Sequence, residues 1–107
     1  MRTALLGAVA LLALTAAAPS SGTGAVVHIR DDHFIPASIT VKVGDKVTFI
    51  NDDDDAHTAT ADNAAWDSEG LNQAQKWEHA FMKPGKVAYH CTVHPMMHGT
   101  IVVRSAK

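Results

Sequence analysis

The sequence predicts an all-β fold, a Greek-key β-sandwich or barrel of about seven to eight strands, for the chain that follows residue 24. Two observations lead to this prediction. β-branched and aromatic residues recur in short runs that often alternate with polar neighbours, and Gly, Pro and Asp turn signals separate the runs. Residues 25–107 suffice for one domain with one core, and a bound metal could contribute to the stability of so small a domain.

The first 24 residues predict a secretory signal peptide followed by a small flexible segment. Arg2 supplies the positive start, an apolar run of Ala and Leu follows, and the alanines at 16–18 offer a cleavage signal, although cleavage after Ala25 is also compatible. The run is about 15 residues long, shorter than the roughly 20 that a spanning helix needs, and no later segment is apolar enough to span a bilayer. We therefore expect an exported, periplasmic protein with no membrane span.

Three strands are expected in the first half of the domain, at residues 26–30, 38–43 and 46–51. The second is typical of a half-buried strand, because Ile39, Val41 and Val43 alternate with polar residues. Turn signals bound these strands: Asp31-Asp32, Pro36 and Gly44-Asp45.

Four more strands are expected at residues 58–61, 76–82, 86–91 and 99–104, and Pro84-Gly85 and Gly99 mark the turns around the last two. Residues 62–75 form the least regular stretch. Trp66 and Leu71 are expected to pack this stretch against the rest of the domain, with room for a short helical turn. Strands at such spacing favour an antiparallel sandwich or Greek-key barrel.

The charge of the chain argues against nucleic-acid binding. Nine Lys and Arg against eleven Asp and Glu give a formal net charge of -2, whereas nucleic-acid binding requires a basic face. The acidic residues include a run of four aspartates at 52–55, just before His57. The run is either a solvated loop or a negative patch that steers a basic partner toward a site at His57.

Cys91 is the only cysteine and the starting point for the functional site. In an exported protein an unpaired cysteine indicates an intermolecular bridge, a reactive thiol or metal ligation, and the nearby His94 favours metal. Met97 follows in the same short turn, and His57 lies upstream. One thiolate, two imidazoles and a weak thioether are the donor set of a mononuclear blue-copper site. The sequence therefore predicts one Cu(I)/Cu(II) ion.

Other donors compete with these four. Met96 is the rival of Met97, and His98 is a further imidazole beside it. The remaining histidines lack ligand spacing and are expected on strands or at the surface: His28, His33, His79 and His90.

At these residues the chain resembles the cupredoxins, within them the small plastocyanin and amicyanin group, and more closely amicyanin. The motifs are Phe34-x-Pro36, the run from Ile39 to Asn51, His57-Thr58, and Cys91-x-x-His94-x-x-Met97. The resemblance implies a β-sandwich with type 1 copper near one end, held by His57, Cys91 and His94 with Met97 as the long axial ligand. It implies single-electron transfer as the activity.

The resemblance also assigns roles around the metal. Asn51 matches the family asparagine that ties the upstream ligand loop to the cysteine loop, with Thr92 as its expected partner. Val93 stands where amicyanins have proline, and its N–H could reach the Cys91 sulfur, which would tune the reduction potential.

The function predicted from these residues is that of an exported electron carrier, a monomer, which shuttles between larger redox proteins such as a c-type cytochrome or a dehydrogenase. Such partners would dock transiently around His94, Pro95 and Met96, with Pro36 completing an apolar collar. An enzyme is not expected, because no general base, nucleophile pair or open metal position is evident. Two alternatives remain open: a copper carrier or scavenger that adds Met96 and His98 as donors, and a metal-free binding module of the same fold.

Overall fold

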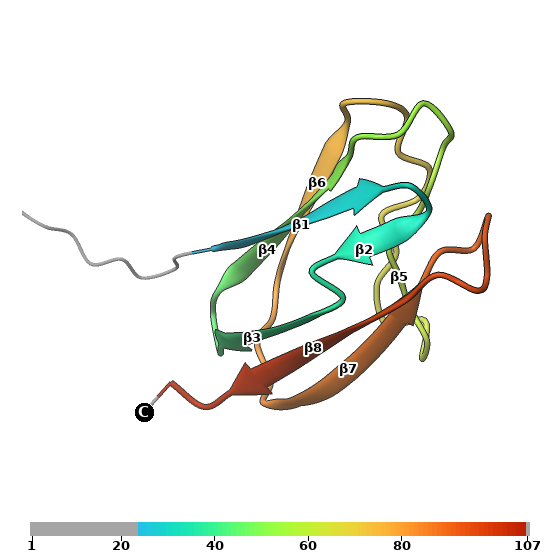
Figure 1. Ribbon diagram of the computed structural model, residues 1–107. Helices are drawn as coiled ribbons and strands as arrows, with labels where there is room; N and C mark the ends of the chain where they lie inside the picture. The colour runs from blue at the N-terminus through green and yellow to red at the C-terminus, as the bar shows by residue number, and fades with distance from the viewer. Residues whose placement is uncertain (1–23, 107) are drawn as a thin grey trace, which may run out of the picture.

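Eight strands form two four-stranded sheets in the computed structural model, which describes residues 24–106 (Figure 1). The first sheet has the order β2-β1-β4-β6, with bounds His33–Ile35, Ala25–Arg30, Lys46–Asn51 and Lys76–Ala80. The second has the order β3-β8-β7-β5, with bounds Ser38–Lys42, His98–Arg104, Gly85–His90 and Thr60–Ala61. The expected signal peptide lies outside the described residues. Within them, no helix is long and apolar enough to cross a membrane.

The all-β prediction is confirmed, and seven of the observed strands match expected ones. The sequence analysis missed β2, because this strand has only three residues and a single buried side chain, Phe34. It also expected antiparallel pairing throughout, whereas β1 pairs with β4 and β3 pairs with β8 in parallel. Alternation of apolar residues gives the face of a strand but not the direction of its neighbour, so this error could not be avoided.

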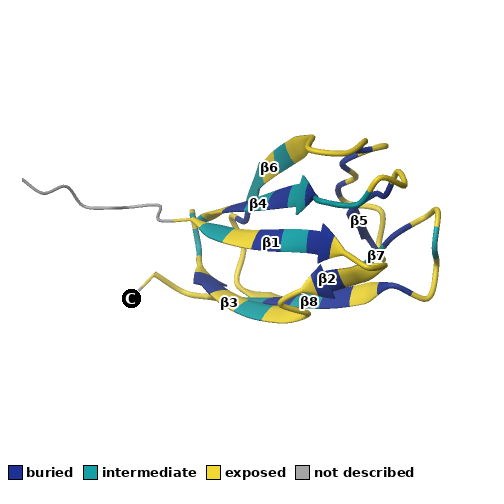
Figure 2. Ribbon diagram, turned by 45° about the horizontal axis from the view of Figure 1, so that its top comes forward, coloured by how far each residue is buried: buried dark blue, intermediate teal, exposed yellow. Residues whose placement is uncertain are grey.

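The core lies between the two sheets and is continuous from one to the other (Figure 2). Alternate residues of β4 and β8 point inward, and Val47, Phe49 and Ile101 are fully buried. Phe49 packs edge-on against Tyr89 of β7, with ring centroids 5.4 Å apart. Residues 62–75 pack on the body through Trp66 and Leu71, as expected, but no part of this stretch is helical.

The β7–β8 pair fixes the segment that carries the predicted ligands. Tyr89 lies opposite Gly99 in the register, and a Cβ at position 99 would overlap the Tyr89 ring, so the close approach requires glycine here. Cys91 directly follows β7 and Met97 directly precedes β8. Both ends of the ligand loop are therefore held by paired strands at one end of the sandwich.

Candidate metal centre

The loop between β7 and β8 is a closed turn that brings three predicted ligands together. The Cys91 N–H donates to the Met97 carbonyl oxygen (3.2 Å), and the Met97 N–H donates to the His94 carbonyl oxygen (2.9 Å). These two bonds close the turn on itself, so the backbone positions of Cys91, His94 and Met97 are fixed relative to one another. Cys91 is fully buried, and His94 is partly exposed.

His57 reaches the same place from the connection between β4 and β5. Its backbone exchanges two hydrogen bonds with Leu71, of 3.1 and 2.8 Å, which anchor it to the 62–75 segment. Its side chain is fully buried. The Nδ1 atom lies 3.7 Å from the Cys91 Sγ, and the Nδ1 atom of His94 lies 3.9 Å from the same sulfur.

These distances fit a metal ion held by all three residues. Ligand atoms of His57, Cys91 and His94 all lie within 4.8 Å of one another. Two metal bonds of about 2.0 to 2.3 Å that open at about 120° would separate their donor atoms by roughly 3.7 Å. The donor set, one thiol and two imidazoles, is that of a trigonal copper site, and the observed spacing leaves room for the ion.

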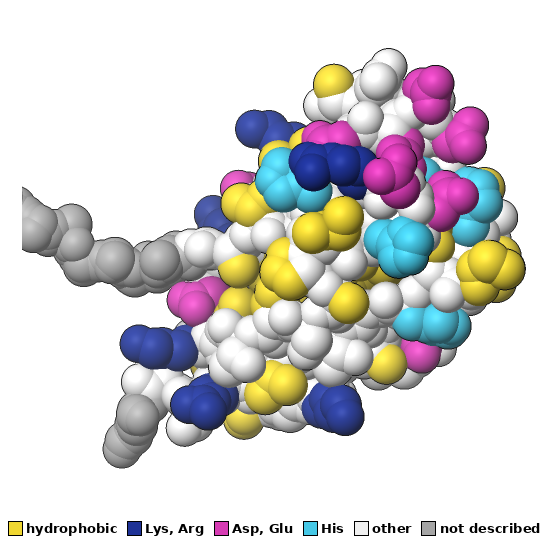
Figure 3. Space-filling view, viewed as in Figure 1, with side chains coloured by type: hydrophobic (Ala, Val, Ile, Leu, Met, Phe, Trp, Pro, Cys, Tyr) yellow, Lys and Arg dark blue, Asp and Glu magenta, His cyan; other side chains and the backbone are white. Residues whose placement is uncertain are grey.

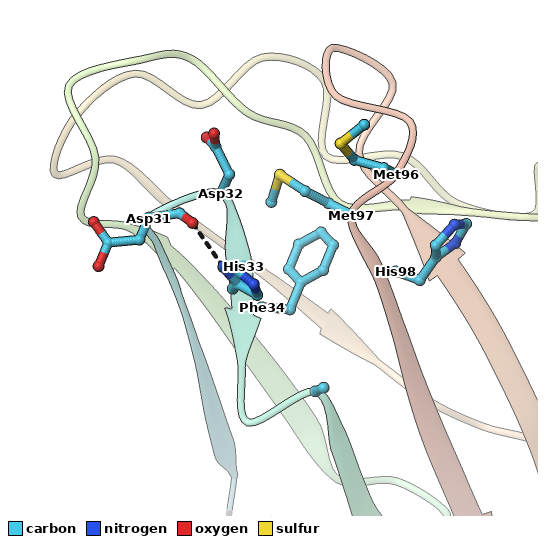
Figure 4. A pocket seen from close by; sticks show the side chains of 8 residues that line it. Asp31, Asp32, His33, Phe34, Met96, Met97 and His98 are labelled. Atoms are coloured by element: carbon cyan, nitrogen blue, oxygen red, sulfur yellow. Dashed lines mark hydrogen bonds between the residues drawn. The ribbon is translucent and has the colours of Figure 1, made fainter.

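The two methionines of the loop differ in burial. Met97 is 3% exposed, whereas Met96 is 80% exposed. Met97 borders a cavity of about 410 Å³ whose other lining residues include Asp32, Phe34 and Met96. In Figure 4 the Met97 side chain extends above Phe34, while the His98 imidazole projects away from it. Burial therefore favours Met97 over Met96 as the fourth ligand, and His98 is exposed.

The Cys91 sulfur accepts a hydrogen bond from a backbone group. The donor is the Thr58 N–H, 3.3 Å from Sγ, one residue after His57. Within residues 24–106 the structure records no corresponding bond from Val93, whose side chain is 52% exposed. Among the described residues, the N–H that reaches the sulfur belongs to Thr58, in the segment between β4 and β5, and not to the loop that carries Val93.

Asn51 holds the His57 loop, but its expected link to Thr92 is wrong. The Asn51 amide donates to the carbonyl oxygens of Asp55 (2.8 Å) and Leu71 (2.7 Å), which uses both of its hydrogens. The bond to the cysteine loop comes from Thr58 instead, whose Oγ1 accepts the Thr92 N–H (2.9 Å). For Thr58 the sequence offered only one signal, its position next to His57.

The aspartate run divides into two pairs. Asp52 binds Arg30 (2.9 Å) and His28 (2.8 Å), and these hydrogen bonds hold the pKa of Asp52 below its usual value. Asp53 binds the Nε2 atom of His57 at 2.9 Å. The solvated-loop interpretation is therefore wrong for this half of the run.

Asp54 and Asp55 are exposed, and they belong to a wider acidic surface near His94. Carboxylate oxygens of Asp32 and Asp55 lie within 4.8 Å of a His94 ring nitrogen. Figure 3 shows acidic side chains gathered at this end of the molecule, with histidines among them. A negative surface thus borders the partly exposed ligand.

The four histidines without ligand spacing all lie in strands, as expected. They are His28 of β1, His33 of β2, His79 of β6 and His90 of β7. His79 stacks on Trp77 (5.2 Å) and Trp66 (5.4 Å), and burial among these rings lowers its pKa.

Comparison with known proteins gives a consistent result. A model of the cupredoxin-like domain family matches residues 3–103. Amicyanin of Paracoccus denitrificans is 31% identical over an alignment of 114 residues, which covers 94% of this chain and 87% of the relative. Amicyanin of Paracoccus versutus is 27% identical over 93 residues, covering 82% and 70%.

Solved structures of amicyanin variants share the fold. A reduced tryptophan-to-tyrosine variant matches with a TM-score of 0.72 and 31% identity, covering 79% of this chain and 86% of the other. A Cu(I) form of a methionine-to-glutamine variant matches with a TM-score of 0.71 and 31% identity, covering 76% and 82%.

Proposed function

The chain belongs to the cupredoxin-like domain family, and from this premise we propose that it is a type 1 copper protein that transfers single electrons. One observation carries the proposal: the donor atoms of His57, Cys91 and His94 converge within 4.8 Å around the only thiol of the chain. In an exported protein such a thiol would otherwise be expected to pair or to react. A thiolate with two imidazoles suits both oxidation states of copper.

In this proposal His57, Cys91 and His94 hold the ion and Met97 is the weak axial ligand, while the ion supplies a reversible one-electron couple. The chain contributes burial and rigidity. Cys91 and His57 are fully buried; Cys91 directly follows β7, and the His57 backbone is bonded to Leu71. The Thr58 N–H stabilises negative charge on the sulfur. Because these groups cannot move far, little reorganisation accompanies a change of charge at the site.

His94 is the exit for the electron, since His57 and Cys91 are closed off from solvent and His94 is partly exposed. Exposed apolar residues surround it, Val93 and Met96 at 52% and 80% exposure, together with Pro95. An apolar patch without strong polar contacts suits brief docking of a redox protein. The acidic surface beside it favours a partner with a basic face, such as a c-type cytochrome or a dehydrogenase.

The carrier works in an exported compartment, the periplasm in a bacterium, once a signal peptide within residues 1–24 has been removed. It acts as a monomer, with residues 25–107 as its single domain. It carries electrons and performs no catalysis of its own.

A visible spectrum of the purified protein with Cu(II) tests the proposal. We expect an intense thiolate-to-copper band, absent in Cys91→Ser because oxygen cannot replace the sulfur donation, and retained in the control His98→Ala. A colourless, tight Cu(I) complex would instead indicate copper storage or delivery. Failure to bind copper would leave a metal-free binding module.

A further inference from the structure

We propose that Asp53 is a positioning residue that fixes the tautomer of His57, so that Nδ1 faces the metal and the oxidised state is favoured. The first half of this inference concerns the metal-free chain. The second half rests on the function proposed above.

The His57 ring lies between two partners. On one side Nδ1 is 3.7 Å from the Cys91 Sγ, and on the other side Nε2 is 2.9 Å from the Asp53 Oδ2. The imidazole is fully buried, and the Asp53 side chain is only 15% exposed. A second carboxylate, that of Asp32, lies 3.5 Å from the same Nε2 atom. Nδ1 thus faces the ligand cluster, and Nε2 faces negative charge.

The Asp53 carboxylate is held by backbone donors. The backbone N–H groups of Asp31 and Asp32 donate to its two carboxylate oxygens at 2.8 and 3.2 Å. A carboxylate accepts hydrogen bonds, so a neutral imidazole in this contact carries its proton on Nε2 and its lone pair on Nδ1.

The turn between β1 and β2 is shaped for this contact. Asp31 and Asp32 have φ values of 54° and 60°, in the left-handed region that few residues other than glycine occupy. This conformation aims two successive N–H groups at one carboxylate. The turn, the carboxylate and the imidazole therefore form one chain of contacts that ends at the metal ligand.

A carboxylate behind a ligating imidazole makes it a stronger donor, and loss of such a partner typically weakens metal binding by about 10- to 100-fold. The stronger donor favours Cu(II) over Cu(I), because the attraction to the ion grows with its charge. Asp53 thus lowers the reduction potential. It does so from within the aspartate run whose last two members, Asp54 and Asp55, are exposed.

Two variants separate this role from plain charge. Asp53→Asn keeps the shape of the side chain and removes its charge, and Asp54→Asn removes the same charge from the neighbouring exposed residue. We expect Asp53→Asn to weaken Cu(II) binding about tenfold more than Cu(I) binding, which raises the one-electron potential by about 59 mV. Asp54→Asn should leave the potential unchanged. Equal shifts in the two variants would overturn the role of the hydrogen bond.

The tautomer itself is measured without copper, by nitrogen-15 NMR of the imidazoles in the metal-free full chain. We expect His57 to carry its proton on Nε2 in the wild type and to lose this preference in Asp53→Asn. A proton on Nδ1 in the wild type would overturn the inference whether or not the protein binds copper. A protonated Nε2 in a protein that gives no blue band would support the positioning role and overturn only the proposed function.

Discussion

The hydroxyl of Thr58 joins the His57 segment to the cysteine loop, and its removal should loosen the site from a distance. Thr58 Oγ1 accepts the Thr92 N–H at 2.9 Å and lies 2.9 Å from Thr60 Oγ1, and the residue is 5% exposed. Thr58→Val keeps the volume and leaves the Thr92 N–H without its partner, whereas Thr60 Oγ1 keeps its bond to Asp67 (3.1 Å). A buried group left unsatisfied costs about 1–3 kcal/mol. Because Thr92 is exposed and water can reach it, we expect a loss of about 1–2 kcal/mol in the free energy of unfolding.

Urea denaturation of the metal-free protein measures this loss. With a slope of about 1.5 kcal/mol per M, the midpoint should fall by about 1 M. Thr48→Val is the matched control, since Thr48 makes only a long, exposed contact of 3.4 Å to Glu78, and its effect should stay within about 0.5 kcal/mol. The blue band should survive in Thr58→Val, because the bond to the sulfur comes from the backbone. Equal midpoints for the two variants would refute the linking role of the hydroxyl.

Three further predictions follow from burial and charge. Met97→Gln should shift the visible spectrum of the copper-loaded protein and lower its potential, since an oxygen donor favours Cu(II), whereas the exposed Met96→Gln should alter only partner docking; the reverse result would exchange their roles. Replacing Asp54 and Asp55 by Asn should slow association with a basic redox protein at low salt, and screening over about 10 Å at 0.1 M should remove the difference. Glu69→Gln combined with Glu78→Gln is its control for total charge, and equal slowing there would exclude local steering. Burial lowers the pKa of His79, so the unfolded chain binds more protons than the folded one between the usual value, about 6.5, and the lowered value. Unfolding experiments on the metal-free protein should therefore show stability rising as pH rises through this window, and less steeply in His79→Phe; identical pH profiles would contradict the assignment.

The fold was largely predictable because the strands that build the core carry a strong pattern. In β4 and β8 buried and more exposed residues alternate almost without interruption, which is typical of strands with one face on a core. β2 could not be found in this way, since a single buried residue has no period. The parallel pairing of β1 with β4 depends on how the chain returns to the sheet, which local sequence does not specify.

The metal centre was predictable only in part, for a similar reason. Cys91, His94 and Met97 are close in sequence, so any turn at this point gathers them. His57 is far from Cys91 along the chain, and its place was inferred from resemblance to the cupredoxins. Its neighbour Thr58 carried no signal of its own, because its role depends on the cysteine loop lying beside it in the fold.

The aspartate run shows how far composition can mislead about charge. Four identical residues in a row read as one patch, yet Asp52 is paired with Arg30 and Asp53 with His57. Two of the four negative charges are thus engaged by side chains of the domain, and what remains for a partner is Asp54 and Asp55 together with Asp32 from the β1–β2 turn. The β1–β2 turn separates Asp53 from the exposed aspartates. Its residues Asp31 and Asp32 have positive φ values, and their N–H groups hold Asp53 against the buried imidazole. A steering surface and a ligand-positioning contact can therefore share one acidic segment, since the backbone decides which carboxylate faces which way.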